Sequence, residues 1–563
     1  MLIWFHYQTS GQQLNGLSNN ALPGDDIWLH TDRDEYIAGE NCWFAAYLFD
    51  RNNNNKPGVS TIAYVELLNY MNSTVIQKRI RLTDGLASGT FQLPDTLSPG
   101  TYILRAYTNI MKNYSAGQYF AKNLGIYNPF SNKEFRRIVV DEQEHESRNI
   151  SGSFVTVRVP SVCERREKVK LEIELDRRVI TSPENTRLSI SVASLSAAES
   201  LSVIDDYLSR KPDRKDLKEA LYRPEREGHL LSGTLISQKP DAVLEDQILL
   251  LSVPGKEARF QYAMTDSEGN FSFVIDNEEI PDEVVVRLKE NESGNLIRIM
   301  SPFLDTYPEY DIVNESLQAG IPPHIEEWIM NYQVSKIYGI SSAGESVRAS
   351  SVNKREIRFY GKPEMELRMA DYILLPAMQE VFFELIPGVA MRTGRAGYGI
   401  TVTNPYDNRT YEEDATLMID GVIIDDPDII AEMNPEIVER IDVIRNEYAV
   451  GGYHFYGIVN VITKSGNYGS FPLPANSVRF SYNINNEEIP FISPDYSVPG
   501  IKESRDPDFR NTLYWRPGLK PDSDGKVTIE FWSSDYRSDY EINIQGITSD
   551  GIPVSYRKII TVR

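Results

Sequence analysis

The sequence contains few cysteines and no long apolar run. Cys42 and Cys163 fall in what we predict to be different modules, so disulfide bonds are not the basis of stability, and we expect both side chains to be buried. No stretch approaches the ~18 apolar residues that a helix needs to cross a bilayer, so we expect no membrane span of the chain's own. The apolar block 1–5 is shorter than the core of a signal peptide, which runs about 7 to 15 residues, and suggests a clipped or misassigned start.

Positive charge is also in short supply. The chain carries 58 Lys and Arg against 81 Asp and Glu, a formal net charge of -23. Nucleic-acid-binding proteins concentrate Lys and Arg on one face, and an acidic surface repels phosphate backbones and anionic membrane surfaces. We therefore expect no nucleic acid among its partners.

The common signatures of catalysis are missing. The six His residues are scattered, and none pairs with another His or Cys at the spacing of metal ligands. The sequence has no Gly-x-Ser-x-Gly elbow, no Walker loop and no paired His and Glu on one predicted helix. We therefore predict that the protein is not an enzyme, that it has no cofactor and no bound metal, and that it has no catalytic residues.

Two acidic clusters leave an alternative open. Residues 30–34 (His-Thr-Asp-Arg-Asp) could offer oxygen ligands to calcium, although such clusters more often lie at turns and strand ends. Residues 425–428 (Asp-Asp-Pro-Asp) could do the same. Their simpler interpretation is a helix start, since carboxylates favour the positive end of the helix dipole.

What the sequence does contain predicts a mainly β chain of several domains. Its 563 residues exceed what one hydrophobic core supports, because domains usually stop growing near 250 residues. Hydrophobic residues make up 41% and aromatics 10%, which argues for folded, strand-rich domains. We predict tandem β-sandwiches together with one small α/β domain.

The most informative stretch is 415–466. An apolar run at 417–419 is closed by Asp420-Gly421, which supplies the positive φ of a tight turn, and 422–424 resumes the strand. A short helix over 428–433, a turn at 434–436, a strand over 438–443, a break at Gly451-Gly452 and a strand over 458–463 follow. The stretch therefore predicts a compact α/β unit.

In this order the motifs resemble the plug domain of TonB-dependent outer-membrane receptors. Residues 434–443 read Asn-Pro-x-x-Val-Glu-x-Ile-Asp-Val, and residues 459–464 read Val-Asn-Val-Ile-Thr-Lys. An opening helix at 378–381 and a Pro-Gly-Val turn at 387–389 extend the resemblance over 376–467. Where such plugs usually carry Ile-Arg-Gly, this chain has residues 401–405, Thr-Val-Thr-Asn-Pro, which departs from a conventional gating role.

The N-terminal part predicts an antiparallel sandwich. Strand-like runs at 43–49, 62–68, 75–82, 102–108 and 119–127 alternate with turn signals. Together with the residues 30–40 and 100–108, the pattern resembles a macroglobulin-type domain of the kind joined to plug-like domains in Bacteroidetes envelope proteins. We expect 21–128 to fold independently.

The remaining segments repeat related patterns. Residues 265–273 resemble the regulatory sandwich found beside carboxypeptidases, and 322–338 predict an amphipathic helix. We read residues 136–148 as a charged linker. The predicted division of the chain is an N-terminal segment 1–20, macroglobulin-like 21–128, a second such sandwich with a helix 150–225, carboxypeptidase-regulatory-like 226–310, a helical or flexible linker 311–375, plug-like 376–467 and a C-terminal macroglobulin-like domain 470–563.

These resemblances imply a non-enzymatic scaffold or binding protein of the cell envelope, associated with the outer membrane on a side that we leave open. Its expected partner is another envelope or outer-membrane protein. Too few residues follow Gly466 for a closed barrel. One alternative is therefore a subunit of a TonB-dependent uptake system whose barrel is a separate chain.

A second alternative is a macroglobulin-like protease inhibitor or a peptidase accessory protein. Neither cysteine has the Cys-Gly-Glu-Gln context of the internal thioester in protease-trapping macroglobulins, which weighs against covalent trapping. Whatever the partner, the apolar strands of the plug-like unit must be covered. In the chain, the nearest candidates for that cover are residues 322–338 and the terminal β-domain.

Overall fold

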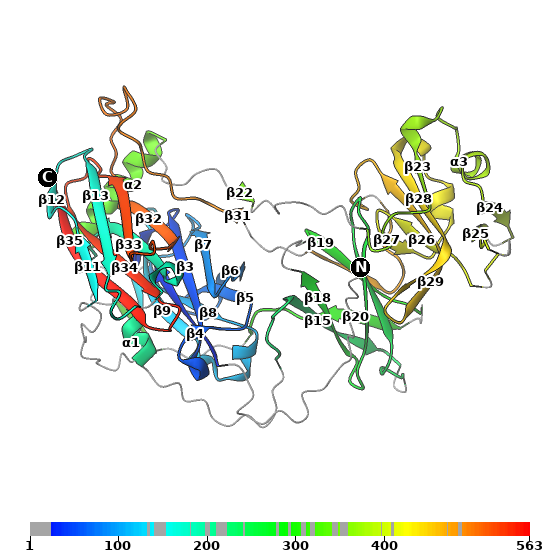
Figure 1. Ribbon diagram of the computed structural model, residues 1–563, viewed down its shortest axis with the longest axis horizontal. Coiled ribbons are helices and arrows are strands. Elements are labelled where there is room, and N and C mark those ends of the chain that lie inside the picture. Colours follow the sequence, from blue (N-terminus) through cyan, green and yellow to red (C-terminus); the bar gives the residue numbers. More distant parts are fainter. Residues whose placement is uncertain are drawn as a thin grey trace. The chain divides into compact units, whose positions relative to one another are not determined.

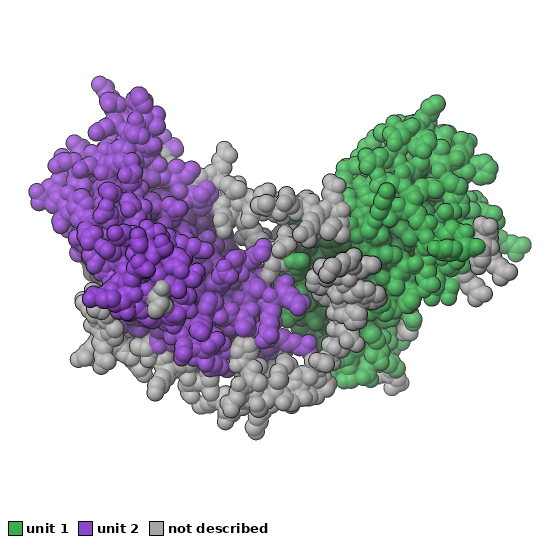
Figure 2. Space-filling model, in the orientation of Figure 1, with its two compact units in different colours: residues 1–13, 229–302, 351–483 green, residues 14–228, 303–350, 484–563 purple. Residues whose placement is uncertain are grey.

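The computed structural model divides the chain into two compact units. Unit 1 comprises residues 1–13, 229–302 and 351–483, and unit 2 comprises 14–228, 303–350 and 484–563 (Figures 1 and 2). The structure describes residues 24–131, 135–139, 154–180, 182–196, 203–209, 222–239, 242–276, 281–290, 294–305, 311–315, 321–339, 347–348, 358–395, 397–406, 410–411, 413–469, 471–481 and 487–563. The predicted N-terminal segment 1–20 lies outside these residues, as does most of the helical appendix expected before residue 222.

The prediction of a mainly β chain built from sandwiches is confirmed. In unit 2, the predicted runs between residues 43 and 127 are all strands of the first sandwich. One of its sheets is β1 (Asp25–Thr31), β3 (Asn41–Asp50), β4 (Lys56–Pro57) and β7 (Leu86–Gln92); the other is β2 (Glu35–Ile37), β9 (Phe120–Tyr127), β8 (Gly100–Tyr107), β10 (Phe135–Val139), β21 (Asp311–Glu315), β5 (Ile62–Leu68) and β6 (Thr74–Arg81).

The charged linker expected at 136–148 begins as a strand. Its first residues belong to β10, which pairs with β8 and antiparallel to β21. The residues from 140 onward lie outside the described part of the chain. The charged side chains led to the wrong prediction for these residues. Strands pair through backbone hydrogen bonds, so a charged segment can also form a strand.

The second sandwich is assembled from two distant segments. The structure corrects the predicted separation of 150–225 from 470–563, because β13 pairs with β33 and β14 with both β32 and β34. In β13 (Lys168–Leu175) buried and outward side chains alternate, as expected of a strand with one face on a core. The other strands are β11 (Val155–Arg158), β33 (Lys526–Trp532), β12 (Val162–Cys163), β35 (Pro553–Val562), β34 (Asp539–Ile547), β14 (Arg187–Ser194) and β32 (Thr512–Leu519).

The two sandwiches of unit 2 share buried contacts. The Tyr47 hydroxyl donates to Ser189 Oγ at 2.7 Å, and His30 Nδ1 lies 2.6 Å from the same oxygen. Trp515 of β32 and Ile547 of β34 belong to the core of the first sandwich. Part of the core of 21–128 therefore comes from residues more than 380 positions later in the sequence, while independent folding of this segment stays a prediction.

The predicted helix forms as α2 (Pro323–Ile337) and packs within unit 2, but its apolar residues are not confined to one face, since Ile337 is 78% exposed. Ile325 and Trp328 are buried against Ile37 of β2. The helix therefore packs on the first sandwich of its own unit. The remaining named elements of unit 2 are α1 (Ile204–Ser209), β22 (Val347–Arg348) and β31 (Glu487–Glu488).

One cluster of side chains in unit 2 contacts the chain just before and just after residues 229–302, which belong to unit 1. Before this segment, the Glu225 carboxylate accepts from the Tyr64 hydroxyl at 2.9 Å; after it, Leu304 donates its backbone N–H to the Tyr107 hydroxyl at 3.0 Å. Lys112 completes the cluster, with its Nζ 4.6 Å from the centre of the Tyr64 ring. Burial lowers the pKa of Lys112 to about 8, although the carboxylates of Glu225 and Glu66 act in the opposite direction.

This pKa predicts a pH dependence of stability. Between pH 8 and 10.5 the unfolded chain holds a proton on Lys112 that the folded chain has released, so folding becomes more favourable as the pH rises through this window. At about 1.36 kcal/mol for each pH unit, the gain is at most about 3 kcal/mol. Urea unfolding at several pH values should show this rise in the wild type and a flatter profile in Lys112→Met. Parallel profiles would contradict the prediction.

Unit 1 begins with two β-sheets that include the carboxypeptidase-like motif. The consecutive residues Leu249 to Val253 of β16 are buried, as expected of a strand with both faces covered. Its last strand comes from beyond the α/β unit, since β30 pairs with β19, so the predicted C-terminal domain beginning at 470 contributes a strand here. The sheets are β18 (Asn270–Asp276), β15 (Gly228–Ser237) and β20 (Asn295–Ile299), and β17 (Arg259–Met264), β16 (Ile248–Val253), β19 (Glu283–Leu288) and β30 (Ser477–Ser481).

The α/β unit contains the elements that its sequence predicts. The hairpin at Asp420-Gly421 forms, with φ of 48° and 77° at these two residues, and the break at Gly451-Gly452 joins two long strands. Two helices are present, α3 (Met378–Leu385) and α4 (Asp428–Ala431). The sheet runs β23 (Met365–Arg368), β28 (Val438–Val450), β29 (Tyr453–Thr463), β26 (Thr416–Ile419) and β27 (Val422–Ile424), and a separate ribbon pairs β24 (Val389–Gly394) with β25 (Gly397–Val402).

Candidate docking module in unit 1

The five-stranded sheet of the α/β unit is covered on both faces by this chain. Along each strand, neighbouring side chains point to opposite faces, so Met418 and Ile419 enter different cores. One core includes α3, α4 and the ribbon, with Val381, Phe382 and Ile430. The other joins the sheet to β16 and β17 through Leu250, Ala258, Phe260, Tyr360, Met418, Ile423, Ile444, Phe455 and Ile458.

The cover on this second face therefore comes from the sandwich that precedes the α/β unit. An aromatic cluster seals it: Phe260 lies 5.0 Å from Phe455 and 5.3 Å from Phe359, measured between ring centres. The turn of the hairpin also touches the sandwich, because Gly255 donates its N–H to the Asp420 carbonyl at 2.9 Å. The second cover suggested by the sequence, the terminal β-domain, is instead part of unit 2 apart from β30.

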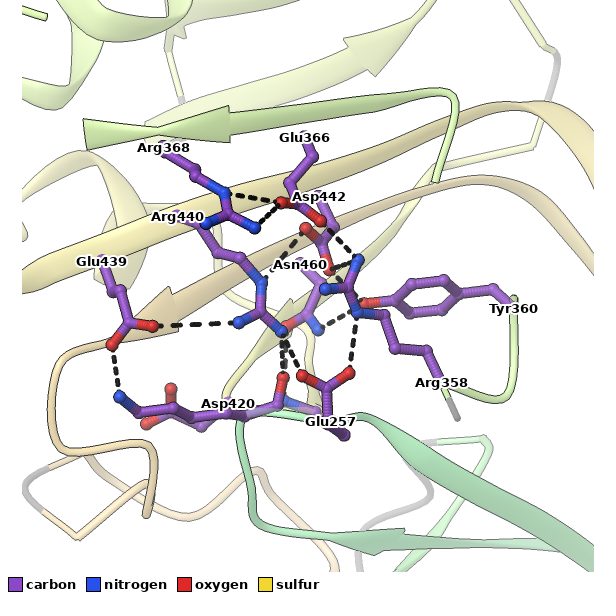
Figure 3. A network of polar contacts seen from close by, with 12 residues as sticks. Glu257, Arg358, Tyr360, Glu366, Arg368, Asp420, Glu439, Arg440, Asp442 and Asn460 are labelled. Carbon is purple, nitrogen blue, oxygen red and sulfur yellow. Dashed lines mark hydrogen bonds and ion pairs between the residues drawn. The ribbon is translucent and has the colours of Figure 1, made fainter. Parts of the chain in front are cut away.

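A network of ion pairs borders this apolar contact (Figure 3). Arg358 is at its centre and donates from Nε to Glu257 of the sandwich and from Nη1 to Glu366 of the sheet, each at 2.8 Å. Its Nη1 also lies 3.3 Å from an oxygen of Asp442. Three carboxylates from three parts of the chain therefore share one guanidinium.

Arg440 makes a second bridge between the same layers. Its Nη2 donates to Glu257 at 3.1 Å and to the carbonyl of Lys256, while its Nε lies 3.4 Å from Asp442. Lys256 in turn pairs with Glu439. The turn before β17 is thus held to β28 by charges of both signs.

Asp442 is fully buried, and neutral donors complete its environment. It accepts from the Tyr360 hydroxyl at 2.8 Å, and Tyr360 accepts from Asn460 at 3.0 Å. Burial raises the pKa of Asp442, although Tyr360, Arg358 and Arg440 act to lower it. Burial also raises the pKa of Tyr360, so this hydroxyl remains a donor at neutral pH. Arg358 lowers the pKa of Glu366, which keeps that carboxylate charged.

Asp420 fixes the hairpin from within. Its carboxylate accepts from the backbone N–H of Thr463 at 2.7 Å, from the Thr463 hydroxyl at 2.7 Å and from the N–H of Tyr468 at 2.9 Å. The sequence motifs Asp-Gly-Val (420–422) and Ile-Thr-Lys (462–464) are thus linked in the structure, because the aspartate of the first accepts hydrogen bonds from the threonine of the second. The arrangement fastens β26 to the end of β29.

Gly421 leaves no room for a side chain. A Cβ at this position would lie 3.1 Å from Ala258 Cα in the adjoining turn, and its φ of 77° disfavours other residues. We expect Gly421→Ala to lower the free energy of unfolding by about 1–3 kcal/mol. Gly399→Ala is the control, since nothing lies within 4 Å of its Cβ position. Equal denaturation midpoints for the two variants would contradict this packing.

In chemical terms, the network is a clamp. Each charged group that it contains faces a partner of opposite sign, and none of its members is a nucleophile beside a base. Among the residues that the structure describes, no three or more His, Cys, Asp or Glu side chains are placed to hold a metal ion. No helix in the described part of the chain is long and apolar enough to cross a membrane.

The two acidic clusters have structural partners. Asp32 accepts from the Trp43 N–H at 3.0 Å and from Thr512 Oγ1 at 2.8 Å, while Asp34 pairs with Lys122 at 2.5 Å. Asp428 lies in the first turn of α4 and accepts from the Tyr398 N–H at 2.6 Å. Strand-end and helix-start roles thus account for both clusters.

Both cysteines are buried, as the sequence predicts. Cys42 is 0% and Cys163 3% exposed, and neither is in a disulfide. Burial raises the pKa of the Cys163 thiol to about 11 and raises that of Cys42 as well. Neither sulfur is therefore a reactive thiolate at neutral pH.

Large apolar side chains remain exposed on the α3 side of the module. Ile373 and Phe383 are each 89% exposed, and Tyr372 and Leu374 about half as much (49% and 50%). Ile373 lies in the connection that leads into α3, and Phe383 lies within α3, next to the buried Phe382. Scattered apolar residues are normal on surfaces, but three in succession, with a further exposed phenylalanine in the helix that follows, suggest a contact surface.

No protein-family model matches the chain, and no curated protein matches it in sequence. Among solved structures, it is similar to Salmonella α2-macroglobulin reacted with methylamine, with 9% identity and a TM-score of 0.25 over 97% of this chain and 40% of that one. For native Escherichia coli α2-macroglobulin the values are 10%, 0.24, 97% and 40%. Latent PorU from Porphyromonas gingivalis matches with 8% identity and a TM-score of 0.17 over 49% of this chain and 33% of that one.

The chain thus spans about 40% of the length of the macroglobulins that it matches. TM-scores this low carry no argument about the fold or the function of this chain, so the macroglobulin-like resemblance rests on the sequence motifs. The plug-like resemblance of 376–467 likewise stays a prediction from sequence motifs.

Proposed function

We propose that the protein is a non-enzymatic scaffold or binding protein of the cell envelope, associated with the outer membrane, and that its α/β unit docks another envelope protein. The location and the class of partner rest on the plug-like and macroglobulin-like motifs. The docking role rests on one observation. The sheet of the module is covered on both faces by the chain itself, whereas the apolar side chains of Ile373, Leu374 and Phe383, outside the sheet, stay exposed.

The covered sheet argues against the sheet itself as the binding surface. Exposing it to a partner would separate Phe260 from Phe455 and take the Glu257 carboxylate away from Arg358 and Arg440, which is costly for partly buried charges. The α3 side needs no such rearrangement. A partner that buries Ile373 and Phe383 would gain apolar area on a surface that already exists.

The test is quantitative capture from native envelope with full-length protein. We expect Ile373→Asp and Phe383→Asp each to reduce recovery of the partner at least tenfold, as truncation of an interface hot spot does. Both side chains are largely exposed, so melting temperatures should not change. Ile559→Asp is the matched control, because Ile559 is 50% exposed on β35 of the other unit. Unchanged recovery with both variants would overturn the proposal.

The identity of what is recovered separates the remaining alternatives. A barrel protein would indicate an uptake subunit whose barrel is another chain. A protease captured by wild type and by Phe383→Asp alike would favour the macroglobulin-like inhibitor. Covalent capture through a thioester is not expected, since Cys42 and Cys163 are buried.

A further inference from the structure

The contact between the two sandwiches of unit 2 has a histidine at its centre. His30 of β1 is 2% exposed, and its ring lies 5.2 Å from that of Trp515 in β32 and 6.1 Å from that of Trp28 in β1. Its Nδ1 is 2.6 Å from Ser189 Oγ of β14. We call this contact of β1 and β3 with β14, β32 and β34 the joint.

The joint suits a neutral His30 ring and not a charged one. A neutral imidazole with its hydrogen on Nδ1 donates to Ser189 and needs no acceptor at Nε2. Ser189 Oγ also accepts from the Tyr47 hydroxyl at 2.7 Å, and its own hydroxyl can donate to the Gln545 carbonyl, 3.4 Å away. An imidazolium carries hydrogen on both nitrogens, and among the residues that the structure describes the buried Nε2 has no acceptor.

The charges that act on His30 are positive. Burial lowers the pKa of His30 well below its usual value, and the charges of Lys122 in β9 and Arg557 in β35 lower it further. Lys122 pairs with Asp34 and Arg557 with Glu541, so these two carboxylates already have cationic partners. Protonation of His30 would therefore add a third positive charge to a buried setting, which is costly.

We propose that the joint between the two sandwiches is acid-sensitive and that protonation of His30 opens it. At neutral pH the uncharged ring packs beside Trp28 and Trp515, and the joint is closed. At acid pH the charged ring no longer fits, and the joint opens while each sandwich keeps its own fold. This device lies within unit 2 and does not depend on the docking role proposed for the α/β unit.

The direction of the pH effect follows from the difference between the open and the closed joint. In the open joint His30 meets water and regains its usual pKa of about 6.5, so the open state binds a proton that the closed state lacks. Each pH unit below 6.5 therefore favours opening by up to about tenfold, down to the pKa of the closed state. Two carboxylates act in the opposite direction. Burial raises the pKa values of Asp32 and Glu541, so their protonation favours the closed state as the pH falls, and a substitution of His30 is needed to isolate its contribution.

Hydrogen exchange of the Trp28 indole N–H in the full-length protein tests the proposal. Trp28 is 1% exposed beside His30, so we expect its indole to exchange through opening of the joint. After correction for the intrinsic rate, lowering the pH from 7.5 to 5.5 should speed this exchange about tenfold more in the wild type than in His30→Asn, whose side chain does not titrate. His454→Asn is the matched control and should behave as the wild type, because that side chain is 50% exposed in unit 1. Equal pH dependence in the wild type and in His30→Asn would overturn the proposal.

Two further measurements separate opening of the joint from unfolding of a sandwich. The backbone amides of β13, which belongs to the other sheet of the second sandwich, should show no acceleration that depends on His30. Acceleration of β13 in parallel with the Trp28 indole would mean that the sandwich itself unfolds, contrary to the proposal. If His30→Asn does not fold, NMR of the wild type labelled with ¹³C-histidine decides the question: the His30 ring should be neutral at pH 5.5 in the closed protein, and an imidazolium signal from closed protein at this pH would refute the proposal.

Discussion

Replacing Arg358 with methionine is expected to lower the free energy of unfolding of unit 1 by about 3–5 kcal/mol. The substitution keeps much of the apolar stem but removes the charge that Glu257, Glu366 and Asp442 share. The fully buried Asp442 would keep only Arg440, 3.4 Å away, as a charged partner, and weakening the compensation of a buried carboxylate costs more than losing an exposed ion pair. Urea unfolding followed by far-UV circular dichroism would measure this decrease in the free energy of unfolding.

Arg368→Met is the matched control for this change. Arg368 also pairs with Glu366, at 2.7 Å, but its side chain is 65% exposed. Ion pairs between exposed groups contribute about 0–1 kcal/mol, so this variant should resemble the wild type. Equal losses for the two arginines would show that the network does not act as a buried clamp.

Trp515→Ala is expected to destabilise the first sandwich of unit 2, although the residue belongs to a strand of the second. Trp515 is 5% exposed, and its ring lies 5.2 Å from that of His30 in β1. Removing a buried tryptophan typically costs about 3–5 kcal/mol. Hydrogen exchange should therefore speed up in β1 and β3, hundreds of residues away in sequence.

The control here is Ile559→Ala, on the same sandwich but half exposed, which should leave exchange in β1 unchanged. The alternative outcome is informative. If Trp515→Ala unfolds the second sandwich and leaves exchange in β1 and β3 at the wild-type rate, residues 21–128 fold independently, as the sequence suggested, and the shared core is wrong.

Local patterns predicted the local elements correctly. Asp420-Gly421 and Gly451-Gly452 mark the two hairpin turns of the α/β sheet, because the chain needs positive φ at the first pair and a reversal at the second. The strands from 43 to 127 and the helix α2 were also recognisable from side-chain periodicity. Such signals depend on neighbours within a few residues, which a sequence displays directly.

Pairings between distant segments were not predictable in the same way. β13 and β33 each show the alternation of a sandwich strand, but nothing in either names the other as its neighbour, and they are separated by about 350 residues. The ion-pair network around Arg358 and Arg440 was unpredictable for the same reason. Glu257 and Arg440 are ordinary charged residues in the sequence, and only the fold places them 3.1 Å apart.

One sequence signal could have identified the clamp. Arg440 and Asp442 alternate with apolar residues within β28, so a strand whose inner face is buried was bound to carry these charges into an interior. Buried charges require partners of opposite sign. The search for those partners would have led to the turn at 253–258, where Lys256 and Glu257 stand together beside β17.

The claim that the α/β sheet is held against the sandwich of its own chain can be tested without any substitution. Lys256 and Glu439 form an ion pair across that contact, with side chains 43% and 38% exposed, so a zero-length carbodiimide should join them in the full-length protein. Lys168 and Glu530, paired at 2.6 Å within one sheet of unit 2 and similarly exposed, serve as the internal reference. The account predicts comparable yields of the two crosslinked peptides; recovery of the Lys168–Glu530 crosslink without the Lys256–Glu439 crosslink would contradict it.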